Sequence, residues 1–280
     1  MLSRGQLAAD LRAFGLARGE FVMVHASLRA IGEVAGGPDE VHLAIKDVVG
    51  TEGGLIMYAS CPAYVDDVGR GNLTAEQEAE VLEKLPPFDP HTARSSRENG
   101  ALVELLRTYP GSRVNPHVAR FVVWGNHTDY LLSEQPWDYA FGRGSVLDRF
   151  VALDGKILLP GSDHDNVTFL HYAEHIADFP GKRVARFKVP VLENGVRVWR
   201  EMAEFDTSGE GVHPNWPDRF FAQLVDGYLA ATDNHGGPVG NAASHCFSAR
   251  GLLEHAIPVM CAVASGEAGV AIDAHAMRKA

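Results

Sequence analysis

The chain has 280 residues, 25 of them Lys or Arg and 36 Asp or Glu, so its formal charge is −11 with His neutral. A surface that binds nucleic acid needs clustered Lys and Arg, and the basic residues here occur as isolated pairs such as Lys182-Arg183. The charge balance therefore argues against a nucleic-acid partner and favours cationic ones. With 46% apolar and 22% charged residues, the composition is that of a globular protein. We expect one continuous domain over residues 1–280.

Cysteine usage and the first residues bear on the compartment. Cys61, Cys246 and Cys261 form no CxxC pair, which favours a reducing environment without a zinc ribbon. Residues 1–15 have the pattern of an amphipathic helix and lack the apolar core of a signal peptide. No run approaches the roughly 18 apolar residues of a membrane span. We expect a cytoplasmic protein with no membrane partner.

Predicted helices and strands alternate along the first half of the chain. The apolar spacing predicts helices over 1–15, 38–49, 74–85 and 100–111, and strands over 20–25, 55–60 and 119–125. This order is typical of βαβ units. Residues 61–99, which are rich in proline, form a long excursion that we expect to be ordered and functional.

The second half continues the same pattern and adds a hairpin. It predicts helices over 145–153, 166–179, 217–233 and 249–265, a strand over 156–161, and a hairpin over 183–206. Asn194-Gly195 marks the hairpin turn. The fold class expected is α/β, with a mixed central sheet flanked by helices.

The sharpest local motif is LHYAEHIAD at 170–178. His171, Glu174, His175 and Asp178 would share one helical face. HYAEH matches the inverted zinc motif HxxEH, which predicts a metallohydrolase, although no third ligand is identifiable by spacing. The alternative is a solvated face held by pairs of side chains, above all at His175 and Asp178. His171 follows a strand and a turn, which is where α/β ligand sites lie.

Two groups of carboxylates form further candidates. Glu204 and Asp206 stand two residues apart at the end of the hairpin, so both would project from one face of the strand. Asp66 and Asp67 lie beside Tyr64 in the long excursion. Each group is also explained by an exposed strand end or a turn that favours Asp.

A segment of small residues at 25–37, HASLRAIGEVAGG, lies between a predicted strand and a helix. Its backbone N–H groups would suit a phosphate. It is neither GxGxxG nor a P-loop, so a plain strand-to-helix connection explains it equally well.

Six ordered blocks of sequence resemble one family. After HASLRAIG, which resembles HSSLxxLG, come blocks within 36–60, 86–116, 141–162, 167–183 and 204–209, so the resemblance covers about residues 10 to 250. The chain is identified by this resemblance as similar to the aminoglycoside 3-N-acetyltransferases, whose fold is that of the antibiotic N-acetyltransferases. The R/Q-x-x-G-x-G/A signature of the GNAT acetyltransferases is not found.

The resemblance implies a function and a set of site residues. It implies acetyl transfer from acetyl-coenzyme A to the 3-amino group of the deoxystreptamine ring of aminoglycoside antibiotics, without a metal, giving resistance. The coenzyme would be bound by His25, Ala26, Ser27, Leu28, Arg113, Val114 and Pro116. His171 matches the catalytic histidine, Glu204 and Asp206 match paired carboxylates, and Tyr64, Asp66 and Asp67 fall in an acidic substrate loop.

Three positions depart from the family pattern. Val114 replaces a Ser that binds the coenzyme in many members, and Tyr139 stands where relatives often carry a histidine. The third position is His164, which is catalytic, contacts the substrate or has no part in the reaction.

The reaction requires a base, because the substrate amine is mostly protonated at neutral pH. We expect His171 to act as this base with Glu204 or Asp206 as its partner, and backbone N–H groups after His25 to hold the oxyanion. Cys61, which has no local histidine, is expected to be a structural thiol. The zinc metallohydrolase and a binder of polycations without catalysis remain alternatives. The acceptor, whether an antibiotic or a housekeeping amine, and the oligomeric state, including a homodimer, stay open.

Overall fold

The computed structural model describes residues 1–60, 68–69, 71–206 and 213–267. Tyr64, Asp66, Asp67 and Cys61 lie outside these ranges. The strands of the described part are β1 (Phe21–Val24), β2 (Gly54–Tyr58), β3 (Arg113–Val114), β4 (Phe121–Gly125), β5 (Lys156–Pro160), β6 (Val184–Glu193), β7 (Val196–Phe205), β8 (Gly237–Val239) and β9 (Ala242–Ser248).

The helices match most of the predicted ones. They are α1 (Arg4–Ala13), α2 (Leu28–Ile31), α3 (Asp39–Val49), α4 (Ala75–Lys84), α5 (Ala101–Thr108), α6 (Thr128–Leu131), α7 (Val146–Ala152), α8 (Leu170–Ile176), α9 (Phe220–Ala231) and α10 (Ala249–Ala264), with 3-10 turns at Arg97–Asn99 and His164–Asn166. Side-chain caps fix several starts; Ser3 and Thr74 each form a capping box. Among the described residues no helix is both long and apolar enough to cross a bilayer.

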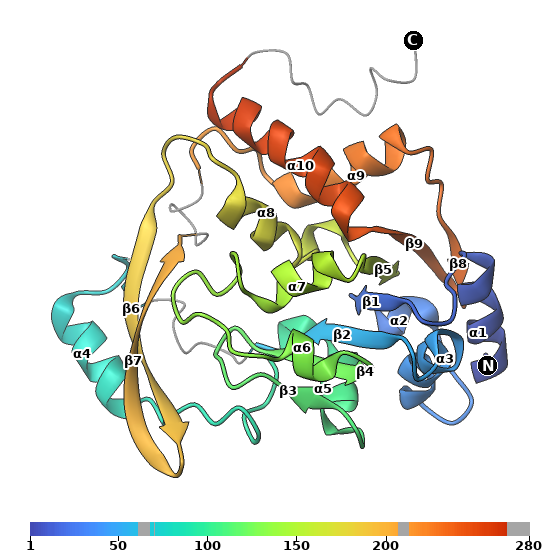
Figure 1. Cartoon of the computed structure of the whole chain (residues 1–280), viewed down its shortest axis with the longest axis horizontal. Helices are drawn as coiled ribbons and strands as arrows, with labels where there is room; N and C mark the ends of the chain where they lie inside the picture. The colour runs from blue at the N-terminus through green and yellow to red at the C-terminus, as the bar shows by residue number, and fades with distance from the viewer. Residues whose placement is uncertain (61–67, 70, 207–212, 268–280) are drawn as a thin grey trace.

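Seven strands form the central sheet, in the order β3-β4-β2-β1-β5-β9-β8 (Figure 1). β1 pairs in parallel with β2 and β5, and the outer pairings are antiparallel. The predicted mixed sheet flanked by helices is confirmed. The parallel centre aligns the carboxyl ends of β1, β2 and β5 at one edge, the position where α/β proteins bind ligands. β8 and β9, in a region expected to be mostly helical, extend the sheet beyond the prediction.

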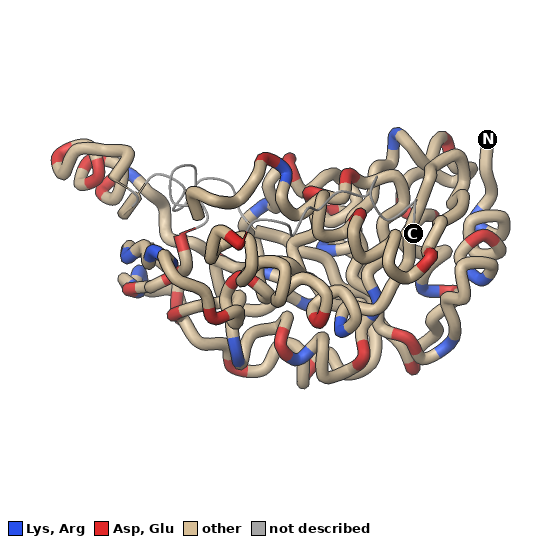
Figure 2. Tube along the Cα trace, turned by 90° about the horizontal axis from the view of Figure 1, so that it is seen from above, with Lys and Arg blue, Asp and Glu red and all other residues tan. Residues whose placement is uncertain are grey.

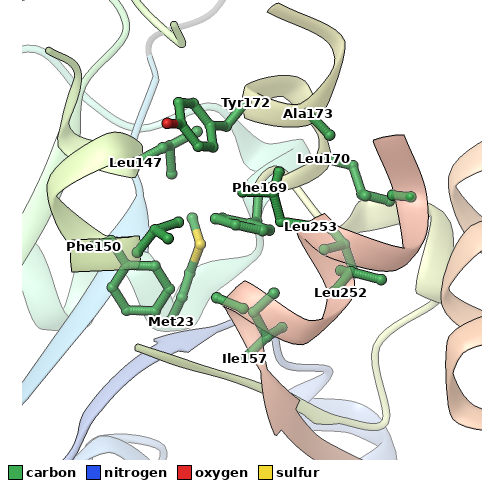
Figure 3. Packing of buried hydrophobic residues seen from close by; sticks show 14 of the residues in the cluster. Met23, Leu147, Phe150, Ile157, Phe169, Leu170, Tyr172, Ala173, Leu252 and Leu253 are labelled. Atoms are coloured by element: carbon green, nitrogen blue, oxygen red, sulfur yellow. The ribbon is translucent and has the colours of Figure 1, made fainter. Parts of the chain in front are cut away.

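Alternation along the strands divides the core between the two faces of the sheet. Phe21 and Met23 of β1 join one cluster, while Val22 and Val24 join the other. The first cluster packs under α7, α8, α9 and α10, and Figure 3 shows Met23 and Ile157 of the sheet facing Phe150 and Phe169. The second cluster packs under α1, α3 and α5. Helix α8 is thereby fixed above the carboxyl edge of the sheet.

The hairpin β6–β7 stands outside the sheet and turns where the sequence predicts. Asn194 and Gly195 have φ values of 50° and 77°, as a tight hairpin turn requires. Its inner face packs against part of the excursion, and Phe88 bridges to Val191. Helix α4, which has no buried residue, lies at the outer end of the molecule, where Figure 2 shows a run of acidic positions.

Candidate active site

A cavity of about 290 Å³ opens at the carboxyl edge of the parallel strands. Its walls come from the ends of β1 and β2, the turn before α5, the connection from β5 to α8, and α9. It is lined by Val24, His25, Ala26, Met57, Tyr58, Glu98, Asn99, Gly100, Ser162, Asp165, Asn166, Thr168, His171 and Phe221. The structure therefore brings together two predicted regions, the segment after β1 and the first turn of α8.

His171 faces this cavity from the first turn of α8. Its Nδ1 lies 2.7 Å from Oε2 of Glu174, and its side chain is 31% exposed against 4% for Glu174. Phe141 and Phe221 flank the imidazole, with ring centroids 5.4 and 5.0 Å away. Because an ionised carboxylate only accepts, Nδ1 carries the proton in the neutral ring, and Nε2 keeps the lone pair of a base.

The prediction that Glu204 or Asp206 pairs with His171 is wrong. The partner is Glu174, because residues three apart on a helix are neighbours on one face. The motif contains this signal, since it places Glu174 three residues after His171, whereas Glu204 and Asp206 are implied by the resemblance alone. Phe141 and Phe221 carried no signal in the sequence.

Glu204 meets the other histidine of the motif. Its Oε2 lies 2.9 Å from Nε2 of His175, and its Oε1 accepts the N–H of Ala140 at 2.7 Å. The side chain of His175 is 2% exposed, so the prediction of a solvated helical face is wrong for this residue. Asp178 lies beyond the end of α8 and is exposed. The helix predicted over 166–179 is shorter because a 3-10 turn precedes it.

Asp206 lies just past the end of β7 and is buried. Its Oδ2 accepts from Nη2 of Arg183 at 2.8 Å, and its N–H donates to the Arg183 carbonyl. Neither Glu204 nor Asp206 lines the cavity described above. Their predicted contact with substrate stays a prediction.

The first predicted coenzyme segment lies partly in the cavity. His25 and Ala26 line it, whereas Ser27 caps α2 through a bond from the Ala30 N–H, and Leu28 packs on the core. The His25 and Ser27 N–H groups continue the sheet by donating to β5 and its end, and the Ala26 N–H between them has no backbone acceptor among the described residues.

His25 is a neutral imidazole. Burial lowers the pKa of His25 to about 4. Its Nε2 is buried and has no hydrogen-bond partner among the described residues. Of the two histidines that line the cavity, His171 is therefore the one suited to accept a proton, and His25 is not.

The second predicted coenzyme segment lies elsewhere. Arg113 pairs with Asp129 and lines a separate cavity of about 520 Å³ beside the turn after β4. Val114 packs against the core, and Pro116 lines a third cavity, of about 780 Å³, under the hairpin turn. The structure does not bring these residues into the cavity of His171, and their coenzyme role stays a prediction.

His164 belongs to a different cluster. Its Nδ1 lies 2.7 Å from Oδ1 of Asp226, and its ring packs edge-on against His245 with centroids 5.1 Å apart. It is not among the residues that line the cavity of His171. The three alternatives for His164 are still untested.

The HxxEH residues do not converge on a metal. Both ring nitrogens of His175 are engaged, one by the His171 carbonyl at 2.6 Å and one by Glu204. Within residues 1–60, 68–69, 71–206 and 213–267, no group of three or more His, Cys, Asp or Glu has the arrangement of a metal site. The geometry therefore gives the motif two separate histidine–carboxylate pairs.

The family model of the aminoglycoside 3-N-acetyltransferases matches residues 23–261. The chain belongs to this family. An aminoglycoside N(3)-acetyltransferase III from Pseudomonas aeruginosa is 35% identical over 91% of this chain and 92% of its own length. An aminoglycoside N(3)-acetyltransferase VIII from Streptomyces fradiae is 35% identical over 96% of this chain and 95% of its own length.

Solved structures agree with this membership. AAC-IIIb in a binary complex with coenzyme A superposes with a TM-score of 0.83 at 36% identity, covering 92% of this chain and 96% of the other. AAC-VIa bound to sisomicin superposes with a TM-score of 0.85 at 33% identity, covering 93% and 98%. The fold is that of these acetyltransferases and not the GNAT fold, so the chain is an acyltransferase and the zinc hydrolase interpretation is not supported.

Proposed function

We propose that this family member transfers the acetyl group of acetyl-coenzyme A to the 3-amino group of the deoxystreptamine ring of an aminoglycoside, with His171 as the general base. The observation that carries the proposal is the His171–Glu174 pair, which faces the cavity at the carboxyl edge of the sheet. Modification of the drug at this amine would confer resistance.

The chemistry needs one proton acceptor. The amine nitrogen attacks the thioester carbonyl carbon, and Nε2 of His171 takes the proton that the nitrogen releases. Collapse of the tetrahedral intermediate breaks the C–S bond, and the departing thiolate of coenzyme A takes the proton from the His171 imidazolium, which regenerates the base. Histidine suits both transfers because it gains and loses a proton near neutral pH.

Glu174 supplies orientation and charge. It holds the proton of the neutral imidazole on Nδ1, so Nε2 faces the substrate as a lone pair. When His171 accepts the proton, the buried carboxylate stabilises the imidazolium. A local partner one turn away on the same helix keeps this geometry independent of loop movement.

The oxyanion of the tetrahedral intermediate needs N–H donors in the same cavity. The Ala26 N–H is the donor we assign, because the flanking His25 and Ser27 amides are already bonded to carbonyl groups. Backbone donors are fixed by the strand they follow, so they need no rearrangement when charge develops.

Carboxylates suit a polycationic drug. Glu98 and Asp165 line the cavity, and Glu98 is exposed. Each charge-assisted hydrogen bond to an ammonium group is worth roughly 1.5–3 kcal/mol. The substrate role predicted for Tyr64, Asp66 and Asp67, which lie outside the described residues, stays a prediction.

The test is a thiol-release assay with acetyl-coenzyme A and a panel of aminoglycosides, with the acetylated position assigned by NMR of the product. We expect release with drugs that carry a free 3-amino group and none with the same drugs pre-acetylated at that amine. Equal release with the pre-acetylated drugs would contradict the assigned position. Drug binding without release would favour the polycation binder.

A further inference from the structure

The second histidine of the motif, His175, lies one turn beyond the base and faces away from the cavity. Its side chain is 2% exposed, and that of Glu204, its partner on the hairpin, is 9% exposed. The proposed reaction uses neither residue, since the base already has Glu174. A buried polar pair of this kind is costly to form unless every atom finds a partner.

Hydrogen bonds connect the pair to the base. Nδ1 of His175 lies 2.6 Å from the His171 carbonyl, which can only accept, so this nitrogen carries a proton. Nε2 lies 2.9 Å from Oε2 of Glu204. The carboxylate therefore reaches the backbone of His171 through one intervening ring.

The other oxygen of Glu204 holds the segment just before Phe141, whose ring packs against the base. Oε1 accepts the N–H of Ala140 at 2.7 Å. Phe141 follows directly, and its ring lies 5.4 Å from that of His171 and 5.8 Å from that of His175. One carboxylate thus holds both the helix that carries the base and the loop that flanks it.

Both ring nitrogens of His175 face acceptor atoms. This arrangement fits a ring protonated on both nitrogens beside an ionised Glu204, because imidazole is a stronger base than carboxylate. Glutamine at position 204 would keep every bond with a neutral ring: its oxygen accepts from Ala140, and its amide donates to Nε2 of His175. The Glu204→Gln substitution therefore separates the hydrogen-bond geometry of the network from the charge of the carboxylate.

We propose that His175 and Glu204 form a positioning pair, with the ring doubly protonated, that fixes the base His171 and the neighbouring Phe141 ring relative to each other. This inference rests on the proposed role of His171. It gives Glu204 a task other than contact with the acceptor amine or the drug. It also explains why a second histidine follows the base by one helical turn.

The experiment compares Glu204→Ala, Glu204→Gln, His175→Gln and the double variant Glu204→Ala/His175→Gln in the thiol-release assay. We expect Glu204→Ala to lower kcat roughly 10- to 100-fold, with KM for acetyl-coenzyme A changed less than about threefold, since misplacement by about 1 Å has such effects. Glu204→Gln should recover most of the lost kcat. The double variant should fall no lower than the worse single variant, because the two residues act as one unit.

The matched control is Glu201→Gln, an exposed carboxylate on the same strand that pairs with Lys188 and should leave kcat unchanged. The proposal is wrong if Glu204→Gln is as impaired as Glu204→Ala, because the charge itself would then serve the reaction or the drug. It is equally wrong if Glu204→Ala keeps the wild-type kcat or if the two losses add.

A measurement independent of turnover separates this inference from the proposed function. In ¹⁵N-histidine NMR spectra of the whole protein, we expect His175 to show two protonated ring nitrogens in the wild type and one in Glu204→Gln. A singly protonated ring in the wild type would overturn the pair, whatever the enzyme acetylates. If no aminoglycoside yields thiol, the proposed function fails while this signature still decides the pair. The NMR comparison uses only the wild type and Glu204→Gln, so it tests the pair even if Glu204→Ala does not fold.

Discussion

Two histidine–carboxylate pairs occur one turn apart on α8, and they differ in what the remaining ring nitrogen faces. The distances to the carboxylates are similar, 2.7 Å for His171–Glu174 and 2.9 Å for His175–Glu204. His171 lines the cavity and its Nε2 has no hydrogen-bond partner among the described residues, whereas Nδ1 of His175 lies against a backbone carbonyl. The two pairs thus share their residue types. They differ in role because only His171 has a ring nitrogen available to accept a proton from substrate, whereas His175 is a positioning residue.

Removing His171, whose pair with Glu174 lies at the cavity, should have the largest effect. We expect His171→Ala to lower kcat/KM by about 10²- to 10⁴-fold, the usual contribution of a general base. Coenzyme A binding, measured by titration calorimetry, should persist because the variant changes none of the residues predicted to bind the coenzyme. Turnover close to that of the wild type would remove His171 from the role of base.

Neutralising the partner of the base should cost less. Glu174→Gln keeps a hydrogen bond to Nδ1 but cannot stabilise the imidazolium, so we expect kcat to fall roughly 10- to 100-fold. A double variant with His171→Ala should be no slower than His171→Ala alone, because the carboxylate acts through the ring. Additive losses would show that Glu174 contacts the substrate directly.

Exposure also separates the carboxylates of the site. Glu98 is exposed in the cavity wall, whereas Glu174 is buried, and salt screens exposed charges far more than buried ones. We expect KM for aminoglycosides to rise several-fold when ionic strength goes from about 0.05 to about 0.5 M, with kcat changed less. The kinetic series at increasing NaCl checks this, and a fall in kcat at constant KM would contradict it.

The fold was predictable to the extent that it rests on local pattern. Apolar periodicity predicts the strands of the parallel centre, and Asn194-Gly195 predicts the hairpin turn. β8 and β9 are not predicted, because the β9 sequence AASHCFS shows no regular alternation of apolar and polar residues and its pairing with β5 depends on a partner more than 80 residues earlier in the chain.

The candidate site was predictable only in part. The resemblance gives His171, and helical spacing alone would have given Glu174. The partner of Glu204 could not be found this way, because contact between α8 and β7 depends on how the hairpin folds back. Phe141 is likewise positioned by the turn around Tyr139, whose φ is 53°, and by bonds from that turn to β7.

Lys46 on α3 lies away from the site and contrasts with the two histidines of α8. It is a buried cation with no hydrogen bond to a carboxylate among the described residues. Its Nζ is buried without a hydrogen-bond partner among the described residues and lies 4.0 Å from the Tyr109 ring and 4.6 Å from the Trp124 ring. Burial lowers the pKa of Lys46 from 10.5 to about 8. Between these values the unfolded chain binds the additional proton, so the free energy of unfolding rises with pH over this window.

The variant Lys46→Met removes the buried charge and should abolish this dependence. At about pH 7 we expect it to be more stable than the wild type by on the order of 1 kcal/mol, and the difference should shrink as the pH rises from about 8 to about 10. Urea unfolding at both ends of the range measures this. A wild type more stable than Lys46→Met at pH 7 would mean that attraction to the two aromatic rings outweighs the desolvation of the ammonium group.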